Sequence, residues 1–537
     1  MKVTAVLSLL HEPPTGSATR LFRGKPVLEW TVGRLARAKR LGAITALCWD
    51  DQLASLDPIS RSTGLEVFSK GPRVALPQLD GVTTAQKWAD GWRGGLLSTC
   101  HFDLGFYAPW HHELCEKTQS DAVLLIDPSS ALVDPELIDG LVAHAQADDS
   151  LEFAFSPAAP GFAGVLILTT LLNRLAAANT HFGRLMHYHP DQSSREPLAG
   201  ESCAPTPTPV ARTPHRFTLE SHRQIHRITA AMESLNGQLV SSGAEELVRR
   251  VHAHQSPDPL PREVVLELNT TRSTRPIFWA GASLNITRPD LTIAAAEQLF
   301  AELASFADTR ITIAGVGDPL LAPDVFRIID LAKSHGPFPV HLETDLHGIS
   351  ADTVTRLAAS PVDIISVHLP ALSPQTYAKV MGCDGYAAVL NNLRLLLSER
   401  QTRRSALPIV VPVFTKCQAN PAEMEAWYDQ WLRAIGSAVV RGPSDCAGQI
   451  PATAVADMSP PGRRPCTRIQ SRLTVLSDGR VISCEEDVLG LQRLGIMGEE
   501  SISQIWQKQF EALRSDHRKG ELSKHILCQR CREWHRP

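Results

Sequence analysis

The sequence lacks a long apolar run and lacks a strong charge imbalance. Across 537 residues, no uninterrupted hydrophobic stretch approaches the roughly 20 residues that cross a bilayer. The formal net charge is only −4, so nothing indicates a nucleic acid or an anionic membrane as partner. Residues 1–14 have no small-residue cleavage site and favour a buried strand over a leader peptide. We therefore expect a cytoplasmic protein that binds neither nucleic acid nor membrane.

The chain is longer than one hydrophobic core usually serves, and its composition changes along its length. Residues 1–195 alternate apolar runs with amphipathic patterns, which predicts an α/β domain with a mostly parallel sheet. A stretch rich in Pro and Thr follows, so residues 196–260 are predicted to be a linker and helices. Another Pro-rich stretch separates a central domain, 261–445, from a C-terminal domain at 460–537.

The central domain contains six strand-like runs rich in Val and Ile, with helical patterns between them. The runs lie at 264–270, 309–315, 339–345, 363–369, 409–415 and 437–442. Six successive strand–helix units predict parallel strands joined by right-handed crossovers. Because eight such units close the usual barrel, six predict an open, partial (β/α)6 barrel of the TIM type.

Four of the eleven cysteines gather near the C-terminus. Cys528 and Cys531 form a C-x-x-C pair, Cys484 ends a predicted hairpin strand, and Cys466 enters the domain. In a reducing compartment, disulfides explain such cysteines poorly. Four thiolates on short loops suit zinc or a cubane iron–sulfur cluster. The ligand count leaves zinc and iron open, and it also leaves open that only the C-x-x-C pair matters.

The order of features in this tail is specific. A C-x17-C spacing encloses the hairpin SDGRVISC, and an LGIMG turn, an SISQIW helix and a terminal CQRCREW follow. This order resembles the SPASM domain of radical-SAM maturases. The resemblance implies that Cys466, Cys484, Cys528 and Cys531 hold one auxiliary [4Fe-4S] cluster with no iron left open for substrate. Its implied role is electron transfer or scaffolding.

The central domain is similar to the barrel of radical-SAM enzymes. Its motif GVGDPLL follows the second strand and resembles the glycine-rich loop whose backbone receives the amine of S-adenosylmethionine in that family. Close approach of the backbone is the physical reason for glycine there. The resemblance implies a cofactor site at Gly315, Gly317, Asp318 and Pro319, with Ser366 on the fourth strand.

The loop after the first central strand departs from that family. The family places a C-x3-C-x2-C motif there, whereas this chain has Ser273, Ile277 and Ala280, with Trp279 keeping the aromatic. Radical generation needs three thiolates on a cluster and one iron open to S-adenosylmethionine. The replacement predicts no reductive cleavage of S-adenosylmethionine by the usual route. A shifted alignment or a cluster held by other ligands is the alternative, and the candidates are Cys383, Cys417 and Cys446.

The N-terminal domain carries a basic loop, GSATRLFRGKPVLEW, after its first strand. It resembles the signature loop of cytidylyltransferase-like sugar nucleotidyltransferases, which implies a Rossmann-type fold. Arg20, Arg23 and Lys25 would then contact a nucleotide triphosphate, and Asp127 would bind Mg²⁺. The second acidic cluster of that family is missing, because APGFAGVLILTTLLNRL contains no Asp or Glu.

The arrangement as a whole resembles the proteins called spiro-SPASM. We predict a protein that binds one auxiliary cluster without radical chemistry. The alternatives are a nucleotidyltransferase that acts on a sugar phosphate and a zinc-stabilised interaction protein. The sequence indicates no catalytic residue, and it leaves open whether the partner is a peptide, a protein or a small molecule.

Overall fold

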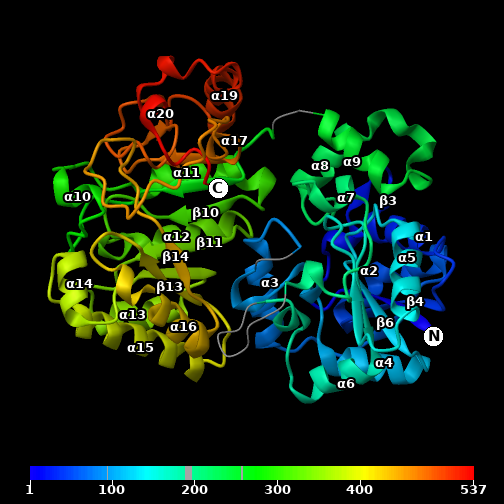
Figure 1. Cartoon of the computed structure of the whole chain (residues 1–537). Coiled ribbons are helices and arrows are strands. Elements are labelled where there is room, and N and C mark those ends of the chain that lie inside the picture. Colours follow the sequence, from blue (N-terminus) through cyan, green and yellow to red (C-terminus); the bar gives the residue numbers. More distant parts are fainter. Residues whose placement is uncertain (93–94, 188–195, 255–257, 537) are drawn as a thin grey trace. The chain divides into compact units, whose positions relative to one another are not determined.

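The computed structural model of the chain divides into two compact units, Met1–Ser256 and Pro257–Pro537. Each unit contains one large sheet, and Figure 1 colours the first unit from blue to green and the second from green to red. The structure describes residues 1–92, 95–187, 196–254 and 258–536. The predicted domain boundary at residue 195 therefore lies outside the described residues.

The first unit is built on six strands in the order β5-β4-β1-β6-β8-β7. They are β1 (Val3–Ser8), β4 (Ala43–Cys48), β5 (Glu66–Ser69), β6 (Ala122–Ile126), β7 (Phe153–Phe155) and β8 (Val165–Leu168). The first four in this order run parallel, which confirms the predicted mostly parallel α/β sheet. The chain leaves β1 toward β4 and β5 and returns to β6 on the other side. This reversal makes a topological switch point at the carboxyl ends of β1 and β6, where open α/β sheets bind ligands.

The sheet of the first unit is buried on both faces. Ala122, Leu124 and Ile126 of β6 enter one apolar cluster, while Val123 and Leu125 enter another. Because side chains alternate along a strand, the two clusters lie on opposite faces. The helices are α1 (Val27–Leu35), α2 (Leu53–Thr63), α3 (Pro77–Lys87), α4 (Ala108–Thr118), α5 (Pro135–Gln146), α6 (Thr169–Ala177), α7 (Thr208–Arg212), α8 (His222–Ala231) and α9 (Ala244–Ala253).

The stretch rich in Pro and Thr packs onto this unit. Ala204, Val210, Phe217 and Leu219 are each at most 3% exposed and belong to the core of the first sheet. The spacing of these four residues follows neither a helical nor a strand period. The linker was therefore predicted from the Pro- and Thr-rich composition alone. In the structure, this stretch packs against the core of the first unit through these four buried side chains.

The second unit contains six parallel strands in sequential order. They are β9 (Glu263–Leu266), β10 (Arg310–Ile313), β11 (Val340–Thr344), β12 (Ile364–His368), β13 (Ile409–Thr415) and β14 (Val439–Arg441). The intervening helices are α11 (Ile293–Leu303), α12 (Val325–His335), α13 (Ala351–Ala359), α14 (Pro374–Met381), α15 (Tyr386–Thr402) and α16 (Met424–Ile435). Among the described residues β14 and β9 do not pair, so the predicted open array of six parallel strands is confirmed, with helices in its five connections.

The C-terminal hairpin extends this same sheet. Strand β15 (Arg472–Val475) pairs parallel with β9, and β16 (Arg480–Ile482) and β17 (Arg493–Ile496) continue outward in antiparallel order. The hairpin turns at Gly479, whose φ of 84° suits glycine. In Figure 1 the orange and red tail, which includes α19 (Phe510–Lys519), lies next to α11, and its helix α18 (Ile502–Gln504) contacts α11.

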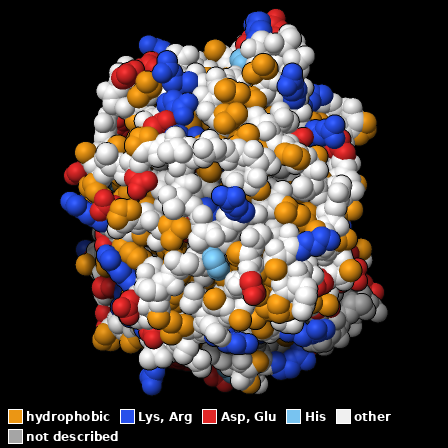
Figure 2. Space-filling view, turned by 90° about the vertical axis from the view of Figure 1, so that its left-hand side faces the viewer, with side chains coloured by type: hydrophobic (Ala, Val, Ile, Leu, Met, Phe, Trp, Pro, Cys, Tyr) orange, Lys and Arg blue, Asp and Glu red, His pale blue; other side chains and the backbone are white. Residues whose placement is uncertain are grey.

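The surface shown in Figure 2 and the described helices were compared with two expectations from the sequence, a nearly balanced charge and the lack of a long apolar run. Figure 2 shows Lys and Arg side chains interspersed with Asp and Glu over one face. Of the helices that the structure describes, none combines the length and the apolar character needed to span a bilayer.

Candidate functional site

The four C-terminal cysteines lie on short segments around the β15–β16 hairpin. Cys466 precedes α17 (Arg468–Ser471), Cys484 follows β16, Cys528 lies in α20 (Ile526–Arg530), and Cys531 comes directly after that helix. Cys466 and Cys528 are 7% and 9% exposed, and the other two are half-buried. All four are free thiols.

The electrostatics show that these thiols are neighbours. Burial and, to a smaller extent, the adjacent Cys466 and Cys531 raise the pKa of Cys528 to about 12. Burial also raises the pKa of Cys531 to about 11 and that of Cys484 well above its usual range. Thiols in such surroundings stay protonated unless a metal takes them as thiolates. The four cysteines therefore form one group of neighbouring thiols, and thiolates are ligands of both zinc and iron–sulfur clusters.

Backbone groups and a cation surround the sulfurs. The N–H of Glu533 donates to Cys531 Sγ at 3.3 Å, and the N–H of Cys466 donates to His517 Nδ1 at 3.3 Å. Arg468 lowers the pKa of both Cys484 and Cys531 against the dominant effect of burial. Such outer contacts orient metal ligands and tune the bound centre.

The donor set fits a cubane cluster. Within the described residues, no three His, Cys, Asp or Glu side chains stand at the spacing of a single metal ion. In a [4Fe-4S] cluster each thiolate binds a different iron, so the four sulfurs need not converge on one point as they do around zinc. The four neighbouring thiols, the N–H that donates to Cys531 Sγ and the nearby Arg468 are the groups that would hold such a cluster.

The glycine-rich loop of the central barrel is packed against the end of β9. A Cβ on Gly315 would lie 2.5 Å from the Glu267 side chain, and one on Gly317 would lie 1.8 Å from the Asn269 side chain. Asp318 is fully buried and accepts hydrogen bonds from Thr344 Oγ1 and from the N–H of Asp345. The close approach predicted for these glycines is thus made by the protein itself.

The other two residues of the predicted cofactor site are also engaged within the protein. Pro319 is buried and begins the short helix Pro319–Leu321. Ser366, on β12, is hydrogen-bonded to His341 Nε2 at 2.8 Å. The structure therefore groups Gly315, Gly317, Asp318 and Pro319 in one loop after β10 and gives Ser366 a partner on β11.

Arg272 lies across the glycine-rich loop. Its guanidinium donates to the carbonyls of Val316 and Gly317 at 3.2 Å each and to both carboxylate oxygens of Asp345 at 2.9 and 3.0 Å. It also lies 4.6 Å from the ring centre of Trp279. The Arg272 side chain is 7% exposed and that of Asp345 is fully buried. Sequence reasoning missed this residue, because an Arg in a polar loop normally reads as solvated.

The ion pair continues as a buried network across the strand ends. Asp345 Oδ1 is 2.9 Å from His368 Nδ1, and His368 Nε2 is 3.2 Å from Glu343, which in turn pairs with Arg441 at 3.3 Å. Burial opposes ionisation, yet Arg272 and His368 lower the pKa of Asp345. Burial lowers the pKa of His368, but its two carboxylate partners raise it overall. Charges of alternating sign thus neutralise one another.

The N-terminal basic loop holds the chain segment that follows the first sheet. Arg20 Nη1 donates to the carbonyl of Glu220 at 2.9 Å, and Arg23 Nη1 donates to that of Met232 at 2.7 Å. Lys25 pairs with Glu29 at the surface. The two arginines are therefore bound to backbone, and no described contact joins them to Asp127.

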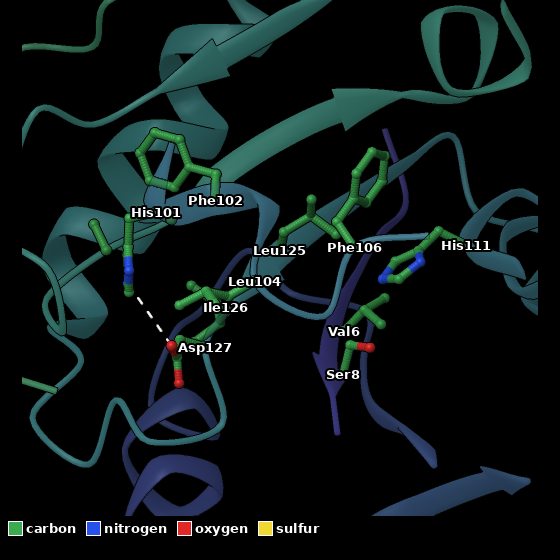
Figure 3. Close-up of a pocket in the computed structure, with 12 residues that line it drawn as sticks. Val6, Ser8, His101, Phe102, Leu104, Phe106, His111, Leu125, Ile126 and Asp127 are labelled. Carbon is green, nitrogen blue, oxygen red and sulfur yellow. Dashed lines mark ion pairs between the residues drawn. The ribbon is translucent and has the colours of Figure 1, made fainter. Parts of the chain in front are cut away.

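Asp127 lies at the switch point of the first sheet, directly after β6 (Figure 3). It accepts two hydrogen bonds from Ser129, and its Oδ2 is 3.9 Å from His101 Nε2. Burial lowers the pKa of His101 to about 4. The adjoining cavity, lined by Ser8, His101, His111 and Asp127 among others, has a volume of about 10 Å³. That is room for one water rather than a nucleotide.

Comparison with known families decides the nature of the tail. Residues 466–532 match the family model SPASM, described as an iron–sulfur cluster-binding domain. The tail is of the SPASM type. An uncharacterized protein of Treponema pallidum (strain Nichols) is 26% identical over 224 residues, which are 39% of this chain and 61% of the relative. The chain therefore spans about three fifths of that relative's length.

Several solved structures share parts of the architecture at low similarity. BtrN in complex with AdoMet and 2-DOIA is 17% identical, with a TM-score of 0.36, over 51% of this chain and 93% of that one. Streptococcus suis SuiB bound to precursor peptide SuiA is 11% identical, with a TM-score of 0.42, over 55% and 82%. A cytidylyltransferase from Leptospira borgpetersenii is 12% identical, with a TM-score of 0.33, over 47% and 92%. These similarities are too low to support the fold, so the strand order given above was taken from the structure of this chain alone.

The SPASM tail contrasts with the loop after β9, which has Ser273, Ile277 and Ala280 at the positions where the sequence-based resemblance predicts the cysteines of radical-SAM enzymes. Ser273 Oγ is hydrogen-bonded to His347 Nδ1 and to the His347 carbonyl, each at 2.9 Å. Ile277 packs on the main core, and Ala280 packs beside Val316 in a small apolar cluster. These positions are thus built into the protein as ordinary polar and apolar contacts.

The three cysteines considered as substitute ligands are placed as follows. Cys417 is fully buried with its Sγ 3.4 Å from Asn420 Oδ1. Cys446 packs beside Ala280 and Ile450, and Cys383 is half-buried against the main core. None of the described contacts joins them to one another.

Proposed function

We propose that this protein binds one auxiliary [4Fe-4S] cluster through Cys466, Cys484, Cys528 and Cys531, and that it does not cleave S-adenosylmethionine. The contrast between two loops carries the proposal. Four neighbouring thiols lie in the SPASM tail, whereas an arginine-centred network fills the loop after β9. When bound, the cluster would supply one-electron redox chemistry or hold the tail together.

The residues of the chain have separate roles in this proposal. The four cysteines hold the cluster, and the N–H of Glu533 and the charge of Arg468 stabilise the thiolates. In the barrel, Arg272 donates hydrogen bonds to the carbonyls of the glycine-rich loop and to the Asp345 carboxylate. These acceptors therefore have partners without a cofactor. The central barrel then serves as a scaffold for the tail.

Metal analysis after anaerobic reconstitution with iron and sulfide tests the proposal. We expect about four irons per chain, a brown protein, and no 5′-deoxyadenosine after addition of S-adenosylmethionine and dithionite. Cys528→Ala should lose most of the iron, while Cys203→Ala, a half-buried cysteine of the first unit, should keep it. About eight irons per chain, or formation of 5′-deoxyadenosine, would refute the proposal. One tightly held zinc with no iron uptake would show a zinc-stabilised tail instead.

A further inference from the structure

One arginine ties the entry of the SPASM tail to its last two cysteines. Arg463 Nη2 donates to the carbonyl of Cys528 at 2.7 Å, and Arg463 Nη1 donates to the carbonyl of Cys531. Arg463 is separated from Cys528 by 65 positions in the chain and from Cys531 by 68. The guanidinium also lies 5.3 Å from the ring centre of Trp534, which is 5% exposed. A planar fork of donors is suited to bridging two carbonyls, which a single ammonium cannot match.

The charge of Arg463 acts on the cysteine pair that it bridges. The guanidinium lies beside this pair, because it donates to the backbone carbonyls of both Cys528 and Cys531. Arg468, the other nearby cation, pairs with Glu486 at 2.6 Å and Glu485 at 3.3 Å, so these carboxylates offset part of its charge. The hydrogen bonds described for Arg463 end on carbonyl oxygens. Its positive charge is therefore available to the thiolates.

From this geometry we infer that Arg463 is a positioning residue that fixes the C-x-x-C ligands and raises the reduction potential of the bound cluster. The inference rests on the proposed function, since it concerns the same four thiols. Reduction adds one electron from an external reductant such as dithionite, and no proton is needed. The reduced cluster is more negative by one charge, so a nearby cation stabilises it relative to the oxidised form.

The experiment compares three variants of the full chain after reconstitution. Arg463→Gln removes both the charge and the bridge, Arg463→Lys keeps the charge but loses the bridge, and Arg464→Gln removes the same charge from the exposed neighbouring residue. Redox titration gives the midpoint potential, and loss of the visible absorbance in excess chelator gives the rate of cluster release. Far-UV circular dichroism establishes that each variant is folded.

We expect separate effects in the two measurements. The midpoint of Arg463→Gln shifts to a more negative potential, while Arg463→Lys and Arg464→Gln stay near the parent. Both Arg463 variants release the cluster about threefold to tenfold faster, because they lose a hydrogen bond from an ionised donor.

Two outcomes would overturn the inference and leave the proposed function intact. One is a parent-like potential and release rate in Arg463→Gln, and the other is equal effects in Arg463→Gln and Arg464→Gln. Failure of the parent chain itself to take up iron would instead count against the proposed function.

Discussion

Replacing Arg272 by Met removes the buried cation that lies on the glycine-rich loop. The methionine keeps much of the side-chain volume, so the change is mainly one of charge and hydrogen bonding. Asp345 is left fully buried without its strongest partner, and the carbonyls of Val316 and Gly317 lose their donor. The variant therefore tests whether the network holds the barrel mouth together.

The magnitude follows from the burial of the pair. Removing one partner of a buried ion pair costs about 3 to 5 kcal/mol, because the other charge stays buried and uncompensated. Asp345 keeps hydrogen bonds from Thr274 Oγ1 and His368, which places the expected loss near the lower end, at about 3 kcal/mol. In Arg272→Met/Asp345→Asn both charges are gone, so we expect the double variant to regain part of that loss.

Urea unfolding followed by circular dichroism measures this loss. With about 3 kcal/mol at stake, the midpoint of the second unit's transition should fall by roughly 1 M urea. Arg275→Met is the matched control, since Arg275 lies in the same loop and is exposed. A loss below about 1 kcal/mol in Arg272→Met, or an equal loss in Arg275→Met, would refute the structural role given to the network.

Two further predictions concern the same network and the first unit. Because the pKa of His368 is raised, its contribution to stability is complete below the ordinary histidine pKa of 6.5 and is lost as pH rises through the higher folded pKa. His368→Gln should therefore flatten the decline in urea midpoint between pH 6 and pH 9, and a decline as steep as in the parent would contradict this reasoning. Arg20→Ala, which removes a hydrogen bond to the Glu220 carbonyl, should lower the stability of the first unit by about 1 kcal/mol. It should leave the binding of nucleoside triphosphates with Mg²⁺ undetectable, as in the parent, and clear magnesium-dependent binding in the parent that Arg20→Ala abolishes would contradict this.

The sequence predicted the central strands well because their signal is local. The run 409–415 is apolar except for its last residue, Thr415, as expected for a parallel strand buried on both faces, and the structure places β13 there. The order of the six strands followed from the regular alternation with helices. The pairing of β15 with β9 could not be predicted, because it joins residues about 200 positions apart and leaves no periodic mark.

The candidate sites show the same division between local and distant causes. The spacing of the four cysteines and the hairpin at Gly479 were visible in the sequence. The glycine-rich loop was also visible, but glycine permits close approach by any group, and here the groups are the side chains of Glu267 and Asn269, which follow β9. Arg272 gave no signal, since its importance comes from Asp345, a residue 73 positions away.

The shared strand edge makes the tail inseparable from the barrel. Glu267, just after β9, donates its N–H to the carbonyl of Val475, and its side chain accepts from the N–H groups of Ser477 and Val316. Removal of the tail would leave one edge of β9 unpaired. It would also remove the contact between Ser477 and Glu267, the residue whose side chain holds the N–H of Val316 in the glycine-rich loop. A bare edge of this kind invites pairing with other chains, so a barrel expressed by itself should aggregate.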